Sequence, residues 1–332
     1  MTKPHLILWG GSWDADAKPI VLGDLDSHAK VSLFFLKDAL SRYFSLSCIE
    51  NFDAIVAGIF DHLREDTIGV LSTFQAGFTQ LRQKKPEIYQ KIVPHLKGKK
   101  FSIIDETTFR RTCEDRLFTV IAPDFAVKNR LHTLLSPSKA HYMGWCASPE
   151  HCYPEDKKSF TVFVDHGHYA GIDYTAMVMD ALAKTKAERP IRVFIQGNAG
   201  VREWDLAVPW AQETYERANK VPWAQMMAHY RQADLFCLTH LESAGLSAIE
   251  AAMCGARLIV PKTNGRAFLH GGLLKPPLDF VCVDCDAEAL RACFAAQIRM
   301  GVDRQRNHET LKAGNSWDQA AQRIYNVLAP SD

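Results

Sequence analysis

The strongest constraint on the fold of this chain is the alternation of strand-like and helix-like segments in its second half. The apolar run SFTVFVD at residues 159–165 has the composition of a buried strand, and a helical pattern follows from about Asp173. A second apolar run, PIRVFIQGN, comes next at residues 190–198. A strand, a helix and a strand in this order favour a parallel sheet. Because ligands of such sheets bind at the carboxyl ends of the strands, the loops there are the first place to look for a functional site.

The first half shows a similar alternation. A helical stretch runs from Asp26 to Phe44, and strand-like runs occur at residues 5–11, 53–60, 99–105 and 116–123. The sequence therefore predicts an α/β protein with two Rossmann-like, doubly wound domains. Gly10 and Gly11 end the first strand, where the backbone can approach a phosphate or an acceptor.

Composition agrees with two domains. The chain has 332 residues, of which 47% are hydrophobic, and this is enough for two sizeable cores. Its formal net charge of +1 argues against a general polyanion-binding protein. Its nine cysteines are an odd number and scattered, which favours reduced thiols in a cytoplasmic protein. We expect neither a signal peptide nor a membrane-spanning segment.

The domain boundaries follow from one segment without periodicity. The stretch CASPEHCYPEDKKS, rich in proline and charge around residues 149–158, is the best linker. We expect a first domain over residues 1–152 and a second over 158–312. Residues 313–332 contain NSWDQAAQRIYNVL, a terminal helix that either packs back on the first domain or stays with the second.

The most informative motif is HLESAGLSAIEAAMCGARLIVP, in which Glu242 and Glu250 lie eight positions apart. Glu242 precedes a small, glycine-containing turn, and Glu250 lies one to two turns into a predicted helix over residues 247–254. A helix entered through such a turn presents free N–H groups and the positive end of its dipole to a phosphate. Carboxylates beside it can accept hydrogen bonds from sugar hydroxyls, so the segment suggests a nucleotide-sugar site.

This motif resembles the donor-binding signature of the retaining glycosyltransferases of family 4, which have the GT-B fold of two Rossmann-like domains facing a cleft. The matching positions are Glu242, Gly245, Leu246, Glu250, Ala251 and Gly255. Ala244 stands where the family has an aromatic residue, and Ser247 where it has proline.

The resemblance implies a role for each motif residue. Glu242 would contact hydroxyls of the donor sugar and take part in catalysis. The backbone around Ala244, Gly245 and Leu246 would lie near the sugar and the diphosphate. Glu250 would hold the ribose hydroxyls. Gly171, in Gly-Ile-Asp, resembles a further donor-binding element of the family.

The chain departs from the family in the loop after residue 165, where an Arg and a Lys normally neutralise the diphosphate. Either His166 and His168 in that loop, or Lys262 and Arg266 after the motif, would have to supply the charge. The two histidines lack Asp, Glu or Cys partners at a recognised ligand spacing, so no metal site is expected. In the first domain, Asp105 and Glu106 are the positional counterparts of a cleft histidine of the family.

The resemblance therefore implies transfer of a sugar from a nucleoside diphosphate sugar to a hydroxyl acceptor, with retention and without a cofactor or metal. A glycan or glycolipid is the expected acceptor. The basic stretch from Arg82 to Arg116 suggests contact with the inner face of a membrane; nucleic acid is not an expected partner. Three alternatives remain open: a sugar-nucleotide epimerase of the same fold, a nucleic-acid glucosyltransferase and a non-catalytic sugar-nucleotide-binding protein.

Overall fold

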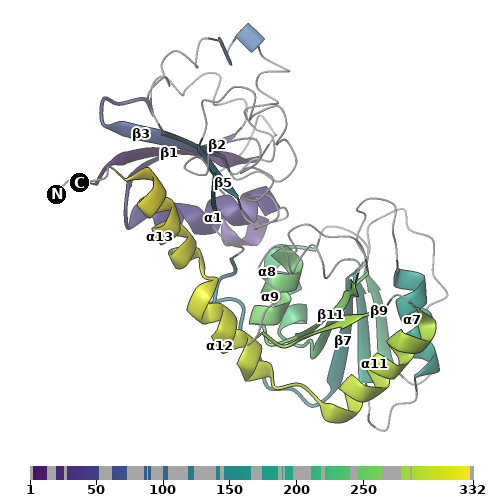
Figure 1. The fold of residues 1–332 in the computed structure, drawn as a ribbon. Coiled ribbons are helices and arrows are strands. Elements are labelled where there is room, and N and C mark those ends of the chain that lie inside the picture. Colours follow the sequence, from purple (N-terminus) through teal and green to yellow (C-terminus); the bar gives the residue numbers. More distant parts are fainter. Residues whose placement is uncertain are drawn as a thin grey trace. The chain divides into compact units, whose positions relative to one another are not determined.

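Figure 1 shows a computed structural model of the protein. It divides into two compact units, a first of Met1–Trp145 with Trp317–Asp332 and a second of Cys146–Ser316. The structure describes residues 3–12, 20–25, 28–51, 62–72, 86–87, 89–90, 100–103, 119–122, 140–142, 146–165, 174–185, 189, 191–196, 211–217, 221–239, 246–262, 278–284 and 286–329.

The first unit contains a six-stranded sheet in the order β2-β1-β3-β4-β5-β6, and every neighbouring pair is parallel. The strand order reverses between β1 and β3, and Gly10 and Gly11 lie near the carboxyl end of β1. The residues from Leu6 to Trp9 have no exposed surface, as expected of a strand covered on both faces. The strands are β1 (His5–Ser12), β2 (Ser45–Asn51), β3 (Thr67–Ser72), β4 (Lys100–Ile103), β5 (Thr119–Ala122) and β6 (Ala140–Tyr142).

Two helices of the first unit pack together although they come from opposite ends of the chain. A short 3-10 turn, η1 (Leu22–Asp24), precedes α1 (His28–Ser41), and α13 (Trp317–Leu328) runs beside α1 (Figure 1). The Trp317 ring stacks on Phe35 with centroids 6.0 Å apart. The terminal helix therefore belongs to the first unit in this structure.

The second unit contains another six-stranded parallel sheet, in the order β12-β11-β10-β7-β8-β9. Numbered from β7 along the chain, this is the order 3-2-1-4-5-6 of dinucleotide-binding Rossmann sheets. Its switch point lies between β7 and β10. The strands are β7 (Phe160–Asp165), β8 (Ile191–Gln196), β9 (Ala211–Arg217), β10 (Leu235–Leu238), β11 (Arg257–Pro261) and β12 (Phe280–Val283).

Helices cover both faces of this sheet (Figure 1). Side chains alternate along β7, so Val162 and Val164 join the core shared with α7 and α11, while Phe163 faces the other way. Phe163 packs on Phe236 and on Tyr230 of α8. The helices are α7 (Thr175–Lys184), α8 (Trp223–Tyr230), α9 (Leu246–Met253), α11 (Ala287–Met300) and α12 (Arg304–Gly314).

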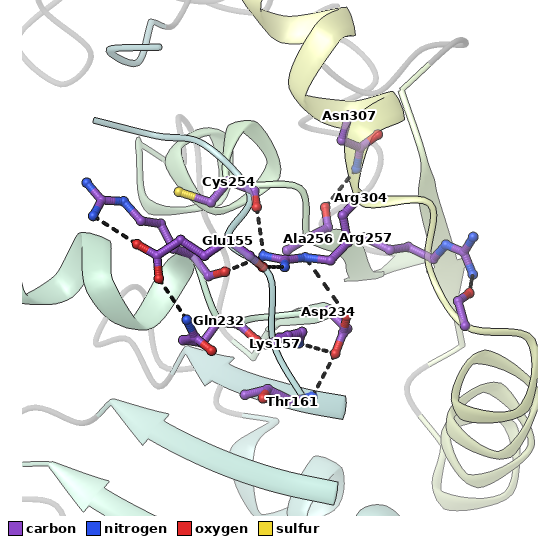
Figure 2. Close-up of polar contacts among 12 residues, drawn as sticks. Glu155, Lys157, Thr161, Gln232, Asp234, Cys254, Ala256, Arg257, Arg304 and Asn307 are labelled. Carbon is purple, nitrogen blue, oxygen red and sulfur yellow. Dashed lines mark hydrogen bonds and ion pairs between the residues drawn. The ribbon is translucent and has the colours of Figure 1, made fainter. Parts of the chain in front are cut away.

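A buried polar network fixes the end of this sheet at which the strands begin (Figure 2). Asp234, just before β10, accepts hydrogen bonds from the Thr161 amide (2.8 Å) and from Lys157. The Arg304 guanidinium of α12 donates to the carbonyls of Glu155, Arg231 and Cys254, which belong to three separate segments. The predicted linker around residues 149–158 thus lies within the second unit, held to its sheet.

Gly255, which follows α9, lies close to the backbone of Arg304. Its φ is +95°, and a Cβ atom there would lie 2.7 Å from the Arg304 carbonyl oxygen. We expect Gly255→Ala to lower the free energy of unfolding by about 1–3 kcal/mol, because both the backbone and the contact are strained. The measurement is urea denaturation followed by circular dichroism.

Gly314, at the end of α12, is the matched control. A Cβ there meets nothing within 4 Å, so Gly314→Ala should be neutral or stabilising. Equal stability of the two variants would contradict the packing described for Gly255.

The α/β class and the two doubly wound sheets confirm the fold predicted from the sequence. The strand predicted over residues 53–60 lies outside the described residues, as do residues 240–245 of the motif. Within the part of the chain that the structure describes, no helix is long and apolar enough to cross a membrane.

Candidate functional site

The candidate site lies at the carboxyl ends of β7 and β10, the switch point of the second sheet. Thr239, which follows β10, donates its hydroxyl proton to the Asp165 carbonyl of β7 (2.7 Å). The same hydroxyl is 2.8 Å from that of Thr175, and the Thr239 carbonyl accepts from the Tyr174 amide (2.7 Å). These bonds tie the start of α7 to the strand ends.

The first turn of α9 points toward the same edge of the sheet. Ser247 donates from Oγ to Oδ2 of Asp165, at 2.9 Å, so the helix start is fixed against the end of β7. The first amides of a helix have no partners within it and carry the positive end of its dipole. This arrangement suits an anionic group, and Asp165, itself buried, already places one carboxylate there.

Glu250 is the most unusual titratable group of the site. It lies one turn into α9 and is only 5% exposed, and its Oε1 atom accepts a 2.7 Å hydrogen bond from Nε1 of Trp223. Burial raises the pKa of Glu250 from 4.5 to about 8, and the bond from Trp223 opposes part of that rise. A carboxyl group so perturbed in a folded protein marks a candidate functional residue.

Among the described residues, the titratable side chains near Glu250 provide no positive charge that would stabilise its ionised form. Burial raises the pKa values of Cys152 and Tyr230 well above their usual range, which keeps both groups neutral. His151 touches the Trp223 ring edge-on with centroids 5.4 Å apart, and burial lowers the pKa of that histidine. Among the residues that the structure describes, Glu250 therefore lies beside neutral side chains, with Trp223 as its hydrogen-bond donor.

The structure places five of the fourteen candidate site residues predicted from the sequence. Leu246 and Glu250 lie on α9, where Leu246 is its first residue and buried. Lys262 directly follows β11, is exposed, and pairs with Asp284 at 2.5 Å. Gly10 and Gly11 are in β1 of the first unit. The others lie outside the described residues: Asp105, Glu106, His166, His168, Gly171, Glu242, Ala244, Gly245 and Arg266.

Two contacts of the site were not expected from the sequence. Trp223 comes 27 residues before Glu250, and Asp165 comes 82 before Ser247, so no local spacing connects them. Among the described residues, no group of three or more His, Cys, Asp or Glu side chains has the arrangement of a metal site.

Comparison with solved structures identifies the fold family of the chain. No family model matches the sequence, and a search of curated proteins gives no significant match. Solved structures match over nearly the whole chain. A sucrose-phosphate synthase from Thermosynechococcus elongatus has a TM-score of 0.66 at 11% identity, covering 98% of both chains.

Two further structures hold nucleotide sugars. Anabaena Alr3699/HepE, in complex with UDP-glucose, has a TM-score of 0.63 at 10% identity and covers 98% of this chain and 99% of its own. The UDP-GlcNAc 2-epimerase from Neisseria meningitidis, bound to UDP-GlcNAc, has a TM-score of 0.57 at 13% identity with the same coverage. At these identities the likeness concerns the fold, and the chain is an α/β protein with the GT-B fold.

Proposed function

We propose that this protein is a glycosyltransferase that moves a sugar from a nucleoside diphosphate sugar to a hydroxyl acceptor. The carrying observation is the buried Glu250 on a helix that starts at the switch point of the second sheet. In this reading the α9 start binds the diphosphate, and Glu250 accepts hydrogen bonds from the ribose hydroxyls. Glu242, four residues before α9, contacts the donor sugar.

The spacing of the two glutamates supports this division of roles. In a nucleoside diphosphate sugar, the diphosphate links the ribose to the sugar that is transferred. With the diphosphate at the start of α9, the ribose lies on one side of that point and the transferred sugar on the other. Glu250 lies inside the helix and Glu242 ahead of it. The UDP-sugar complexes of proteins with this fold make UDP the first nucleotide to test.

Positive charge is needed where the diphosphate leaves, because electrostatic stabilisation there is a large catalytic term. Our candidates are His166 and His168 in the loop after β7, and Lys262 and Arg266 after β11. The ion pair of Lys262 with Asp284 is on the surface, where both side chains are 58% exposed. Such pairs contribute little, so Lys262 can exchange Asp284 for a phosphate at small cost.

The remaining assignments rest on the resemblance to family 4. Transfer proceeds with retention of anomeric configuration and needs no metal or cofactor. The first domain binds the acceptor, a glycan or glycolipid. Within it, Gly10 and Gly11 approach the donor, and Asp105 and Glu106 take part in catalysis. The protein works in the cytoplasm, at the inner face of a membrane when the acceptor is a glycolipid.

An epimerase is the second candidate, since the fold is shared by an enzyme bound to UDP-GlcNAc. Both functions use the same nucleotide site, but an epimerase inverts one carbon of the sugar and requires no acceptor. Product analysis separates them: release of UDP together with a glycosylated acceptor supports the transferase, whereas a changed UDP-sugar alone supports the epimerase.

Two variants should separate nucleotide binding from transfer. At about pH 9, where the Glu250 carboxyl group is ionised, we expect Glu250→Ala to weaken binding of the free nucleoside diphosphate about tenfold or more, because a charge-assisted hydrogen bond contributes about 1.5–3 kcal/mol. Glu242→Gln should lower the transfer rate and leave that affinity unchanged, because its contacts lie beyond the phosphates. Calorimetric titration and a transfer assay measure the two effects.

The experiment begins with a thermal-shift screen of UDP, GDP, ADP and CDP sugars on the wild-type protein, since a ligand of the folded state raises its stability. If both glutamate variants lose nucleotide affinity equally, the two glutamates maintain the structure of the loop and do not contact separate parts of the donor. If the protein binds a sugar nucleotide but catalyses neither transfer nor epimerisation, it is a non-catalytic sugar-nucleotide-binding protein.

A further inference from the structure

We infer that Trp223 is a positioning residue of the nucleotide site, which holds one oxygen of Glu250 so that the other faces the ribose. This inference rests on the proposed function and adds a residue that the donor motif does not contain. Trp223 lies on α8, outside the segment of the two glutamates.

The geometry divides the two carboxyl oxygens between different tasks. Oε1 of Glu250 accepts the 2.7 Å bond from the indole N–H of Trp223. Among the residues that the structure describes, Oε2 has no hydrogen-bond donor, although the side chain is 5% exposed. A carboxyl oxygen that accepts no hydrogen bond from the protein can accept one from a ligand hydroxyl.

The indole is itself firmly held. Trp223 is the first residue of α8, directly after Pro222, and is 7% exposed. The His151 ring packs against it edge-on, and the buried side chains of Met226 and Met227 anchor the same helix. The donor therefore has a fixed place, as a positioning group needs.

The expected consequence is preorganisation of Glu250. With the indole N–H present, the carboxyl group is oriented before the nucleotide arrives, so little freedom is lost on binding. Without it, the carboxyl group can rotate about its last bond, and both oxygens compete for the ribose. Binding should then lose strength and, above all, discrimination between ribose and deoxyribose.

Trp223→Phe removes the N–H and keeps an aromatic ring. The ligands are UDP, GDP, ADP and CDP, each paired with its 2′-deoxy counterpart, titrated by calorimetry. At about pH 9, where the Glu250 carboxyl group is ionised, we expect wild-type protein to prefer the ribose form of its best ligand about tenfold, the difference of one charge-assisted hydrogen bond. Glu250→Ala should abolish this preference, and Trp223→Phe should reduce it to about threefold or less.

Trp317→Phe is the matched control, because it removes a buried indole from α13 of the first unit and should keep the full preference. If Trp223→Phe weakens ribose and deoxyribose forms equally, or changes only the melting temperature, Trp223 merely supports the fold and the inference is wrong. If Glu250→Ala loses the preference and Trp223→Phe retains it, the inference fails and the proposed function stands. If no nucleotide binds the wild-type protein, both fail.

Discussion

Replacing Arg304 by methionine is expected to lower the free energy of unfolding by about 3–5 kcal/mol, the cost of breaking a buried charged network on one side. Arg304 bonds the carbonyls of Glu155, Arg231 and Cys254 at once (Figure 2). These carbonyls precede β7, β10 and β11, so one guanidinium ties together the starts of three neighbouring strands. Methionine fills similar volume but leaves three carbonyls without this donor.

The charge of Arg304 matters as well as its hydrogen bonds. Its Nε lies 3.9 Å from Asp234, which also binds Lys157. Burial lowers the pKa of Lys157 to about 8, while the Asp234 carboxylate opposes this change. Loss of Arg304 therefore removes a cation that, together with Lys157, balances the buried Asp234 carboxylate.

Chemical denaturation of Arg304→Met, with Lys312→Met as control, measures this effect. Lys312 lies on the same helix and is exposed, so its replacement should change stability by less than about 0.5 kcal/mol. Similar transitions for both variants would show that Arg304 does not hold the strand starts together.

The second large effect is a pH-dependent gain in stability for Glu250→Gln. The folded-state pKa of Glu250 is about 8, whereas the ordinary value is 4.5. Below pH 4.5 the carboxyl group is protonated in both states and the wild-type protein carries no penalty. Between these values the unfolded chain releases the proton and the folded protein keeps it, so each pH unit disfavours folding by about 1.4 kcal/mol.

Above pH 8 the penalty levels off, on the order of 5 kcal/mol. Glutamine avoids it and keeps an oxygen that can accept the Trp223 bond. The stability difference between Glu250→Gln and wild type should thus grow as pH rises from 5 to 8, in urea denaturation at several pH values. Glu288→Gln, an exposed acid at the start of α11, should show no such trend. Parallel pH profiles for Glu250→Gln and wild type would place the carboxyl group in contact with water.

Patterns within one segment predicted the local structure well. The helix expected at residues 247–254 is α9, over Leu246–Met253, and the strand expected at 159–165 is β7, over Phe160–Asp165. Both have strong periodicity or a continuous apolar run, and their burial agrees with it. Gly255 directly follows the helix predicted over residues 247–254, and its positive φ is typical of a helix end.

Edge strands were harder to predict. β9, with the sequence AQETYER, is polar and rich in good helix formers, yet it pairs with β8 at the edge of the second sheet. There the tertiary pairing overrides the local propensity. β12, at the opposite edge, is only four residues long and gives a weak signal.

In the candidate site, the sequence likewise did not predict contacts between residues that lie far apart along the chain. The sequence identified Glu250 from its neighbours along the chain, but not the Trp223 donor or the bond between Asp165 and Ser247. These partners come from separate helices and strands that only the folded sheet brings together. A spacing rule identifies a motif, whereas the pKa of its carboxylate depends on what the fold packs around it.

The central claim is that a nucleoside diphosphate binds at the start of α9 with its ribose on Glu250. A crystal structure of the protein with its tightest-binding nucleoside diphosphate tests it most directly. The account predicts the diphosphate against the first turn of α9, a ribose hydroxyl within hydrogen-bond distance of Glu250 Oε2, and the Trp223 bond to Oε1 intact. A nucleotide bound elsewhere, or at α9 with its ribose away from Glu250, would contradict it.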